Sequence, residues 1–386
     1  MPQLSSKPLR VGLVVGETSG ANIALGMLKQ IKALHPNCII EGIGSQPLIE
    51  QGMHSLFEMD ELSVMGLVEV LQHLPRLLHI RKTVVQHFLD NPPDVFIGVD
   101  APDFNLHVEQ KLKDAGIPTV HYVSPTVWAW REKRIHKIGK ATNLVLGVFP
   151  FEQAIYDQYN LPFQFVGHTM ADSIPVEIDQ MQARERLSIE AKSELLALLP
   201  GSRKREIESL LSIFLDTYRK VKVHSPHLKV IIPAVNDARE AQIREILKQE
   251  NMLESCTITR AAARDVMIAA DCALLASGTA ALEAMLCKCP MVVAYKMSTL
   301  TYMMMKRLYK PAYFSLPNIL ANELLVPEFL QDEVNADNLS EQLLKVWRTN
   351  NKNVLSQFIQ IHKTLAAGAD KQSAKAVLSL INRYPA

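Results

Sequence analysis

Short apolar runs alternate with longer helical stretches along the chain, and this alternation constrains the fold more than any other feature of the sequence. In the first half, the β-rich runs cover residues 10–15, 38–43, 94–99, 119–123, 143–148 and 164–166. Helical patterns such as those at 20–34 and 104–115 separate them. Strands that alternate with helices predict βαβ units and therefore parallel sheets.

The second half repeats the rhythm, with β-rich runs at 194–199, 228–233, 256–259, 272–276 and 290–294. The periodicity weakens at 168–194, between the two series. A chain of 386 residues is also too long for one ordinary domain. We therefore expect an α/β fold with two Rossmann-like, doubly wound domains at 1–175 and 176–350, followed by C-terminal helices at 351–386.

The composition excludes several classes of protein. With 41 basic and 40 acidic residues, the chain has no excess charge that would attract nucleic acid. Its five cysteines form no CxxC pair, and Cys287 and Cys289 have no second ligand pair at metal-site spacing. We expect buried, reduced thiols, as in a cytosolic protein, and no metal site.

The N-terminal stretch does not resemble a signal peptide, because its apolar run is short and no small-residue cleavage site follows. Longer apolar stretches are interrupted by Pro, Asp or Lys before the ~20 residues that a bilayer requires. Any membrane contact is therefore expected to be peripheral.

Ligands of doubly wound sheets bind at the carboxyl ends of the strands, so the residues after each run are the candidates for a site. The first run is followed by GETSG. Gly16 and Gly20 let the backbone approach a ligand, Glu17 lies between them, and Ser19 can cap the next helix. The stretch matches neither GxGxxG nor the P-loop. A turn without a ligand is the alternative.

Two carboxylates, Asp100 and Asp103, follow the run at 94–99. Asp100 suits a general base for a substrate hydroxyl, and Asp103 suits the cap of the helix that starts near Phe104. Both residues can equally be ordinary turn residues.

The stretch HYVSPTVWAWR at 121–131 holds two tryptophans, Trp128 and Trp130, beside a group of cations that begins at Arg131. Aromatic planes next to cations suit a sugar, an acyl chain or a phosphate. An aromatic plug under a loop is the alternative.

The run at 194–199 ends in Pro-Gly-Ser-Arg, and a helical pattern follows at once. Gly201 and Ser202 lie at a helix N-terminus, whose free N–H groups attract anions, and Arg203 adds a guanidinium. This combination suits a diphosphate. The alternative for Arg203 is a solvated surface.

A second turn of this kind, Ser277-Gly278-Thr279, follows the run at 272–276. Its small residues expose backbone N–H groups to a phosphate. Glu283 lies about one helical turn further on. Without other information, it can be no more than a favourable acid near a helix start.

The segment 64–82 has apolar residues at helical spacing and cations near its end. A basic, broadly apolar helix of this kind suits an anionic membrane surface or acyl chains, and core packing is the alternative. Pro75 is expected to break or restart the helix. The surface would consist of Val64, Leu67, Val68, Leu71, Leu74, Leu78, Arg76, Arg81 and Lys82.

The sequence resembles the lipid-A-disaccharide synthase family, glycosyltransferase family 19, over nearly its whole length. The stretches that carry the resemblance are GETSG, GVDAPDFN, HYVSPTVWAWR, FVGHTMAD, LLPGSR, LLASGTAALEAML, CPMVVAYKM and LPNILA. The resemblance implies a GT-B fold, in which two Rossmann-like domains face each other across a cleft. The first domain would take the acceptor and lipid, the second the UDP-sugar donor. The C-terminal helices would pack back onto the first domain or be swapped in a dimer.

The family resemblance also implies a reaction. A hexosyltransferase of lipid A and lipopolysaccharide biosynthesis would condense UDP-2,3-diacylglucosamine with 2,3-diacylglucosamine 1-phosphate (lipid X). The products would be the β(1→6) disaccharide 1-phosphate and UDP, formed in one inverting displacement. No cofactor or metal is expected, since helix N-termini and basic side chains can stabilise the departing diphosphate.

Matching motifs imply roles for individual residues. Asp100 would be the base, and Glu283 would bind the ribose. The donor site as a whole would consist of Gly201, Ser202, Arg203, Ser277, Gly278, Thr279, Glu283 and Asn318. One position departs from the family pattern: Ala21 follows GETSG, where the family usually has Asp, so no carboxylate role transfers there.

The resemblance further implies a homodimer in the cytoplasm of a Gram-negative cell. It would be peripherally associated with the anionic phospholipid surface on the inner face of the inner membrane, without nucleic acid. A UDP-sugar 2-epimerase or another GT-B enzyme is an alternative that explains the nucleotide loops but not the lipid-like helix. A non-enzymatic lipid or sugar-nucleotide binding protein is the other.

Overall fold

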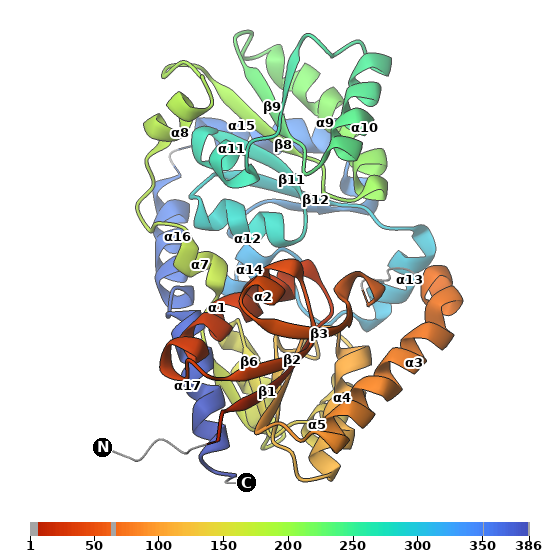
Figure 1. Ribbon diagram of the computed structural model, residues 1–386. Coiled ribbons are helices and arrows are strands. Elements are labelled where there is room, and N and C mark those ends of the chain that lie inside the picture. The colour runs from red at the N-terminus through yellow and green to blue at the C-terminus, as the bar shows by residue number, and fades with distance from the viewer. Residues whose placement is uncertain (1–6, 63–66, 350, 385–386) are drawn as a thin grey trace. The chain divides into compact units, whose positions relative to one another are not determined.

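The computed structural model describes residues 7–62, 67–349 and 351–384. The chain forms two compact units (Figure 1). Unit 1 comprises Met1–Asp172 and Leu365–Ala386, and unit 2 comprises Ser173–Thr364. The chain therefore passes from unit 1 into unit 2 and returns, so that the last helix belongs to the same unit as the N-terminus.

Unit 1 is built on a parallel sheet with the strand order β3-β2-β1-β4-β5-β6-β7. Its strands are β1 (Arg10–Val15), β2 (Ile39–Gly44), β3 (Met53–Glu58), β4 (Val95–Val99), β5 (Thr119–Tyr122), β6 (Leu144–Gly147) and β7 (Phe163–Phe165). Its helices are α1 (Thr18–Leu34), α2 (Gln46–Glu50), η1 (Met59–Glu61), α3 (Leu67–Asp90), α4 (Pro102–Asp114), η2 (Glu132–Arg134), α5 (Ile135–Ala141), η3 (Pro150–Glu152), α6 (Gln153–Gln158), α7 (Thr169–Ser173) and α17 (Ala369–Ile381).

Unit 2 has a second parallel sheet, with the order β10-β9-β8-β11-β12-β13. Its strands are β8 (Leu195–Leu199), β9 (Lys229–Pro233), β10 (Cys256–Thr259), β11 (Cys272–Ala276), β12 (Met291–Tyr295) and β13 (Glu328–Leu330). Its helices are α8 (Gln180–Arg186), α9 (Lys204–Lys222), α10 (Asp237–Gln249), α11 (Ala263–Ala269), α12 (Thr279–Leu286), α13 (Thr299–Leu308), α14 (Leu316–Ala321), η4 (Gln331–Glu333), α15 (Ala336–Arg348) and α16 (Lys352–Leu365).

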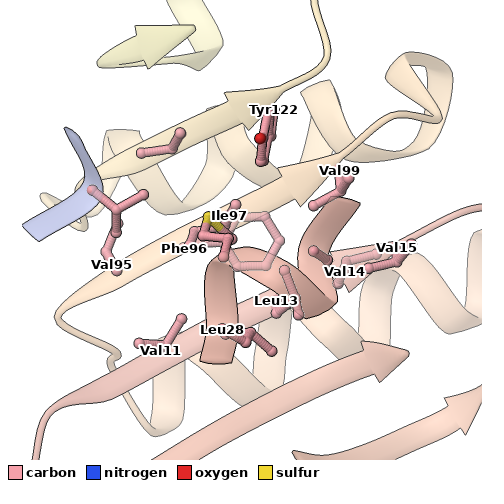
Figure 2. Packing of buried hydrophobic residues seen from close by; sticks show 14 of the residues in the cluster. Val11, Leu13, Val14, Val15, Leu28, Val95, Phe96, Ile97, Val99 and Tyr122 are labelled. Carbon is pink, nitrogen blue, oxygen red and sulfur yellow. The ribbon is translucent and has the colours of Figure 1, made fainter. Parts of the chain in front are cut away.

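The core of unit 1 lies between the central strands and the helices that cover them. β1 and β4 are side by side in parallel register, and their branched side chains are almost fully buried, as Figure 2 shows for Leu13 and Ile97. Such strands pack on both faces, which explains why they are continuous apolar runs rather than alternating patterns. α17 packs against α1, and its Val377 and Leu380 belong to the same buried cluster.

The predicted α/β fold with parallel sheets is confirmed. Every predicted strand is present within about a residue or two of its expected ends, and β3 and β13 are additional edge strands. The two helices of the C-terminal segment belong to different units: α16 lies almost wholly in unit 2, whereas α17 lies in unit 1.

The prediction that Pro75 breaks or restarts its helix is wrong. α3 is continuous, with Pro75 inside it. Pro75 is exposed, so water can solvate the backbone carbonyl that loses its N–H partner there.

Candidate functional site

The turn after β4 carries an unusual backbone. Asp100 and Ala101 both adopt positive φ angles, 55° and 43°, which residues with a side chain rarely do. Two hydrogen bonds hold Asp100: its N–H donates to the carbonyl of Tyr122 (2.9 Å), and its Oδ1 accepts from the N–H of Ala101 (3.0 Å). Strained turns of this kind persist where the surroundings over-determine them, and they concentrate at functional sites. The half-buried Asp100 carboxyl is thereby held at the carboxyl edge of the sheet.

Asn105, which the sequence analysis did not single out, stabilises this turn. It is fully buried in α4, and its Nδ2 lies 2.8 Å from the carbonyl oxygen of Asp100. The same nitrogen lies 3.3 Å from the carbonyls of Val99 and Val14, so it joins the ends of β4 and β1. Asn105 is therefore a positioning residue for Asp100.

The GETSG loop packs directly against the Asp100 turn. A Cβ atom added to Gly16 would collide with Ala101, so this close approach requires glycine. A Cβ added to Gly20 would lie 3.6 Å from the Cβ of Asp100. The structure thus brings the two predicted strand-end loops of unit 1 together.

Two details of these loops differ from the predicted caps. The N-cap of α1 is Glu17, and Ser19 lies within the first turn rather than capping it. Asp103 is likewise inside the first turn of α4, whose N-cap is Ala101, and its carboxylate accepts a hydrogen bond from Arg134 at 2.5 Å. Ala21 is 3% exposed and belongs to the core of unit 1.

The two tryptophans of the 121–131 stretch have different surroundings. Trp128 packs edge-on against Phe151, at 4.8 Å between ring centroids, and Phe151 stacks on Phe149. Trp130 has the guanidinium of Arg131 4.1 Å from its ring centroid. Trp128 therefore belongs to an aromatic plug, whereas Trp130 forms a cation–π pair.

Two titratable groups lie near this plug, the buried Glu152 and the half-buried His168. Burial raises the pKa of Glu152 to about 8, although its Oε2 accepts a hydrogen bond from the N–H of Phe149. Burial lowers the pKa of His168 to about 4. At neutral pH both groups are therefore largely uncharged, as the low dielectric of the interior favours.

The strand ends of unit 2 surround a pocket of about 630 Å³. Both turns that were predicted to bind phosphate line it, and so does Glu283, the predicted ribose ligand. The pocket also contains a cation that was not predicted, Arg260, which directly follows β10. The predicted residues that it brings together are Gly201, Ser202, Arg203, Ser277, Gly278, Thr279 and Glu283.

The first of these turns already holds an anionic group of the chain itself. Oε2 of Glu206 accepts hydrogen bonds from the N–H groups of Ser202 (3.1 Å) and Arg203 (3.2 Å), and Oε1 accepts from the Arg203 guanidinium (3.0 Å). Gly201 has a φ of 120°, and a Cβ there would collide with Glu206. The helix N-terminus thus binds a carboxylate in the way that its dipole favours.

The second turn leads into α12, whose N-cap is Gly278 with a φ of 152°. The N–H groups of a first helical turn have no intrahelical acceptor, so those that follow Gly278 can bind an anion in the pocket. Burial raises the pKa of Glu283, while Arg264, 3.9 Å away, opposes that shift.

Asn318 was predicted to belong to the UDP-sugar site, but it does not line this pocket. It is fully buried, and its side chain is engaged on both sides: Nδ2 donates to Val326 O and to Glu328, and Oδ1 accepts from the N–H groups of Leu325 and Val326. Contact with a donor would require some of these buried bonds to break. In this structure Asn318 stabilises a loop.

A family model described as lipid-A-disaccharide synthetase matches residues 11–381. The chain belongs to this family. It is thus a glycosyltransferase of lipid A biosynthesis.

Similarity to individual members of the family supports this assignment. The chain is 56% identical to the lipid-A-disaccharide synthase of Alteromonas mediterranea over 97% of its own length and 98% of the relative's. It is 52% identical to that of Pseudoalteromonas translucida, over 97% and 98%, and 49% identical to that of Vibrio vulnificus, over 98% and 100%.

Solved structures show the fold alone, because their sequences are distant. The kitacinnamycin glycotransferase has a TM-score of 0.63 at 12% identity, over 97% of this chain and 99% of that one. The UDP-GlcNAc 2-epimerase of Neisseria meningitidis has a TM-score of 0.59 at 14% identity, over 97% and 100%. Family membership, and not this likeness, favours the synthase over the 2-epimerase alternative.

The predicted lipid surface of this synthase-family chain lies partly outside the described residues. Val64 is not described, and nor are the side chains of Leu67, Val68 and Leu71. Of the described positions, Leu74 and Leu78 are 39% and 44% exposed, which argues against core packing there.

The cations of the same segment have separate surroundings. Arg76 forms an ion pair with Glu61 (2.6 Å) and lies over the ring of Phe57. Arg81 donates to the carbonyl of Asp103 (3.4 Å), and Lys82 is exposed. Within the described ranges, no helix is long and apolar enough to cross a bilayer.

The cysteines are all buried, as predicted, and all are free thiols. Burial raises the pKa of all five, for instance that of Cys256 to about 11, which makes them poor nucleophiles. Among the residues that the structure describes, no group of three or more His, Cys, Asp and Glu side chains could hold a metal ion.

Proposed function

We propose that the chain transfers the 2,3-diacylglucosaminyl group of UDP-2,3-diacylglucosamine to the 6-hydroxyl of 2,3-diacylglucosamine 1-phosphate. The products are the β(1→6) disaccharide 1-phosphate and UDP. The observation that carries the proposal is the pocket of about 630 Å³ in unit 2, because the two turns that the sequence predicts to bind phosphate and Glu283, the predicted ribose ligand, line it together. Membership of the family supports the choice of substrates.

Asp100 is the proposed base. Its carboxylate takes the proton of the acceptor 6-hydroxyl as that oxygen attacks the anomeric carbon of the donor. The bond from this carbon to the diphosphate oxygen breaks at the same time, so the α-linked donor gives a β product. The backbone strain at Asp100 and Ala101 and the bonds from Asn105 support this role, since a general base must be held in place.

The departing diphosphate gains negative charge, and the proposed donor pocket offers several groups that stabilise it. The N–H groups at the start of α12, together with Arg203 and Arg260, provide positive potential without a metal. Arg203 has five N–H donors and uses one of them toward Glu206, so it retains capacity for phosphate oxygens. Glu283 is the proposed acceptor for the ribose hydroxyls.

The remaining elements of the proposal concern location. The protein would work at the cytoplasmic face of the inner membrane, where its acylated substrates reside, and would bind the anionic phospholipid surface through α3. A homodimer is part of the same proposal, supported by the family resemblance.

The decisive test is incubation of the protein with both acylated sugars in neutral detergent micelles, with UDP release and the disaccharide both measured. We expect Asp100→Ala to abolish the disaccharide while calorimetry shows unchanged UDP affinity. Asp114→Ala, an exposed aspartate at the other end of α4, is the matched control and should keep wild-type turnover. Near-normal turnover of the Asp100 variant would refute the assigned base.

A second measurement tests the donor pocket. Arg203→Ala should weaken UDP binding about tenfold or more, because it removes a charge-assisted phosphate contact. Lys204→Ala is the control, since Lys204 is the next basic residue but does not line the pocket. Equal UDP affinity of the wild type and the Arg203 variant would contradict the proposal that the diphosphate binds at this turn.

A further inference from the structure

A pocket of about 310 Å³ in unit 1 has no role in the function proposed so far. We call it the Arg134 pocket. Four elements contribute to it: Arg81 comes from α3, His107 and Gln110 from α4, Arg134 from η2 and Lys137 from α5. These elements pack on one another through α4 (Figure 1).

The Arg134 pocket is strongly basic. Arg81, Arg134 and Lys137 contribute three positive charges, and its one carboxylate is Asp103. Burial lowers the pKa of His107, and the nearby charges of Arg81 and Lys111 lower it further. Like charges gathered in a partly desolvated pocket repel one another, so a bound anion would stabilise the arrangement.

The hydrogen bonds of the Arg134 pocket leave donors for a ligand. The side chain of Arg134 is only 18% exposed and donates a hydrogen bond to Asp103, whose own side chain is 83% exposed. Arg81 donates at 3.4 Å to the carbonyl of Asp103, and Lys137 is exposed. Guanidinium groups have five N–H donors each and suit the oxygens of a phosphate.

The Arg134 pocket also starts beside the proposed base. Pro102 and Asp103, which line it, directly follow the Asp100–Ala101 turn, and the bonds of Arg81 and Arg134 both end on Asp103. A substituent of a sugar whose hydroxyl contacts Asp100 would therefore have these cations among its neighbours.

We propose that the Arg134 pocket binds the phosphate monoester of the acceptor, with Arg81, Arg134 and Lys137 as its ligands. This inference rests on the proposed function, because it assigns a place to the acceptor of that reaction. A monoester carries nearly two negative charges at neutral pH, which matches three cations and one carboxylate better than a singly charged phosphodiester does. The donor diphosphate has its own turns in unit 2.

The test compares two acceptors, 2,3-diacylglucosamine with and without its 1-phosphate, in neutral detergent micelles. We expect Lys137→Ala and Arg81→Ala each to raise the KM of the phosphorylated acceptor about tenfold, as loss of a charge-assisted contact implies, and to leave the KM of the dephosphorylated acceptor unchanged. Arg81→Lys should restore part of the affinity, since it keeps the charge. Lys140→Ala, an exposed cation of α5 outside the pocket, is the matched control and should behave as the wild type.

Three results would overturn the assignment. One is an equal change in KM for both acceptors; another is no change for either. The third is an effect of Lys137→Ala that occurs only on anionic vesicles, because the pocket would then bind a phospholipid headgroup.

Failure of the proposed function has a different outcome, in which the wild type makes no disaccharide from either acceptor. The Arg134 pocket is then tested by equilibrium binding of the phosphorylated acceptor in the same micelles. Binding to the wild type that is weakened in Lys137→Ala but not in Lys140→Ala would support the pocket, and equal binding by all three would refute it.

Discussion

Asp100 and Ala101 occupy left-handed backbone conformations that cost roughly 1–2 kcal/mol for residues with a side chain. Hydrogen bonds from Asn105 to three carbonyl oxygens offset that cost, and they connect β1 and β4 at the edge where Asp100 lies. The position of one carboxyl group thus depends on an amide five residues further along the chain.

We expect Asn105→Ala to lower the free energy of unfolding by about 1–3 kcal/mol, because three buried carbonyls lose a donor. The kcat should fall about tenfold or more, as Asp100 becomes less well oriented, while UDP affinity should not change. Chemical denaturation and steady-state kinetics measure the two effects. Asn91→Ala, which removes an exposed amide bonded to His87 alone, should alter neither; a stable Asn105 variant with full activity would contradict the positioning role.

Glu152 provides a prediction about pH. Burial raises its pKa from 4.5 to about 8, so the folded state binds a proton that the unfolded state has released between these values. Its contribution to stability is complete below pH 4.5 and is lost as the pH rises toward 8, at a slope of up to about 1.4 kcal/mol per pH unit. Glu152→Gln, which cannot ionise, should flatten the profile of unfolding free energy in this range. Identical slopes for the two proteins would show that the carboxyl is already ionised when folded.

The sequence predicted those site residues that lie within one strand-end turn. Gly201, Ser202 and Arg203 are contiguous, and a strand followed directly by a helix shows where their N–H groups point. Arg260 was not predicted. Arg134 and Lys137 belong to the cations noted after Trp130, but the pocket that they line was not predicted, because its residues come from separate elements that only tertiary packing brings together. For Asn318, the motif carried no information on the buried bonds that its side chain makes.

Among the elements, α3 differs most from the expectation, since it continues through Pro75. Predictions of strands succeeded for the central ones, because their apolar runs are buried on both faces. β3 was missed since its sequence, MHSLFE, mixes polar and apolar residues at a sheet edge, and β13 has only three half-buried residues. Edge strands lack the two-sided burial that produces a recognisable run.

The exposed leucines of α3 lead to a prediction about membrane binding. The double variant Leu74→Ser with Leu78→Ser should partition less into anionic vesicles, as apolar area is lost from the proposed membrane-binding surface of α3, and its stability should change by no more than about 0.5 kcal/mol per site. Vesicle sedimentation and thermal unfolding measure these quantities. Leu89→Ser is the control, because Leu89 is 39% exposed on the same helix but lies near its other end. If the control lost as much vesicle binding as the double variant, the effect would not depend on the position of Leu74 and Leu78 in α3.

At the scale of the whole molecule, the chain crosses between its units twice, and the returning segment is fixed in unit 1. The carboxylate of Asp172 accepts hydrogen bonds from the N–H groups of Gly368 (2.9 Å) and Ala369 (2.6 Å), which form the start of α17. The N–H of His168 donates to the carbonyl of Leu365 at 2.8 Å. These three bonds lie within unit 1. They connect the last residues before the chain enters unit 2 with the first residues after it returns.

Asp172→Ala should therefore destabilise unit 1 by about 1–2 kcal/mol, the typical effect of losing a helix cap, without affecting unit 2. Hydrogen exchange resolved by segment measures the two units separately. Asp179→Ala removes the corresponding cap of α8 in unit 2, so it should destabilise unit 2 and leave the stability of unit 1 unchanged. If both variants changed the same unit, the two units would not unfold independently.

The return of α17 to the core of unit 1 also affects the order in which a growing chain can fold. A ribosome releases every residue of unit 2 before it releases α17, whereas the sheet of unit 1 is synthesised first. Until Val377 and Leu380 emerge, the apolar side of α1 that they cover must face solvent or a chaperone. The first-made half of the polypeptide is thus completed last, and premature termination near the 3′ end of the message would leave part of its core uncovered.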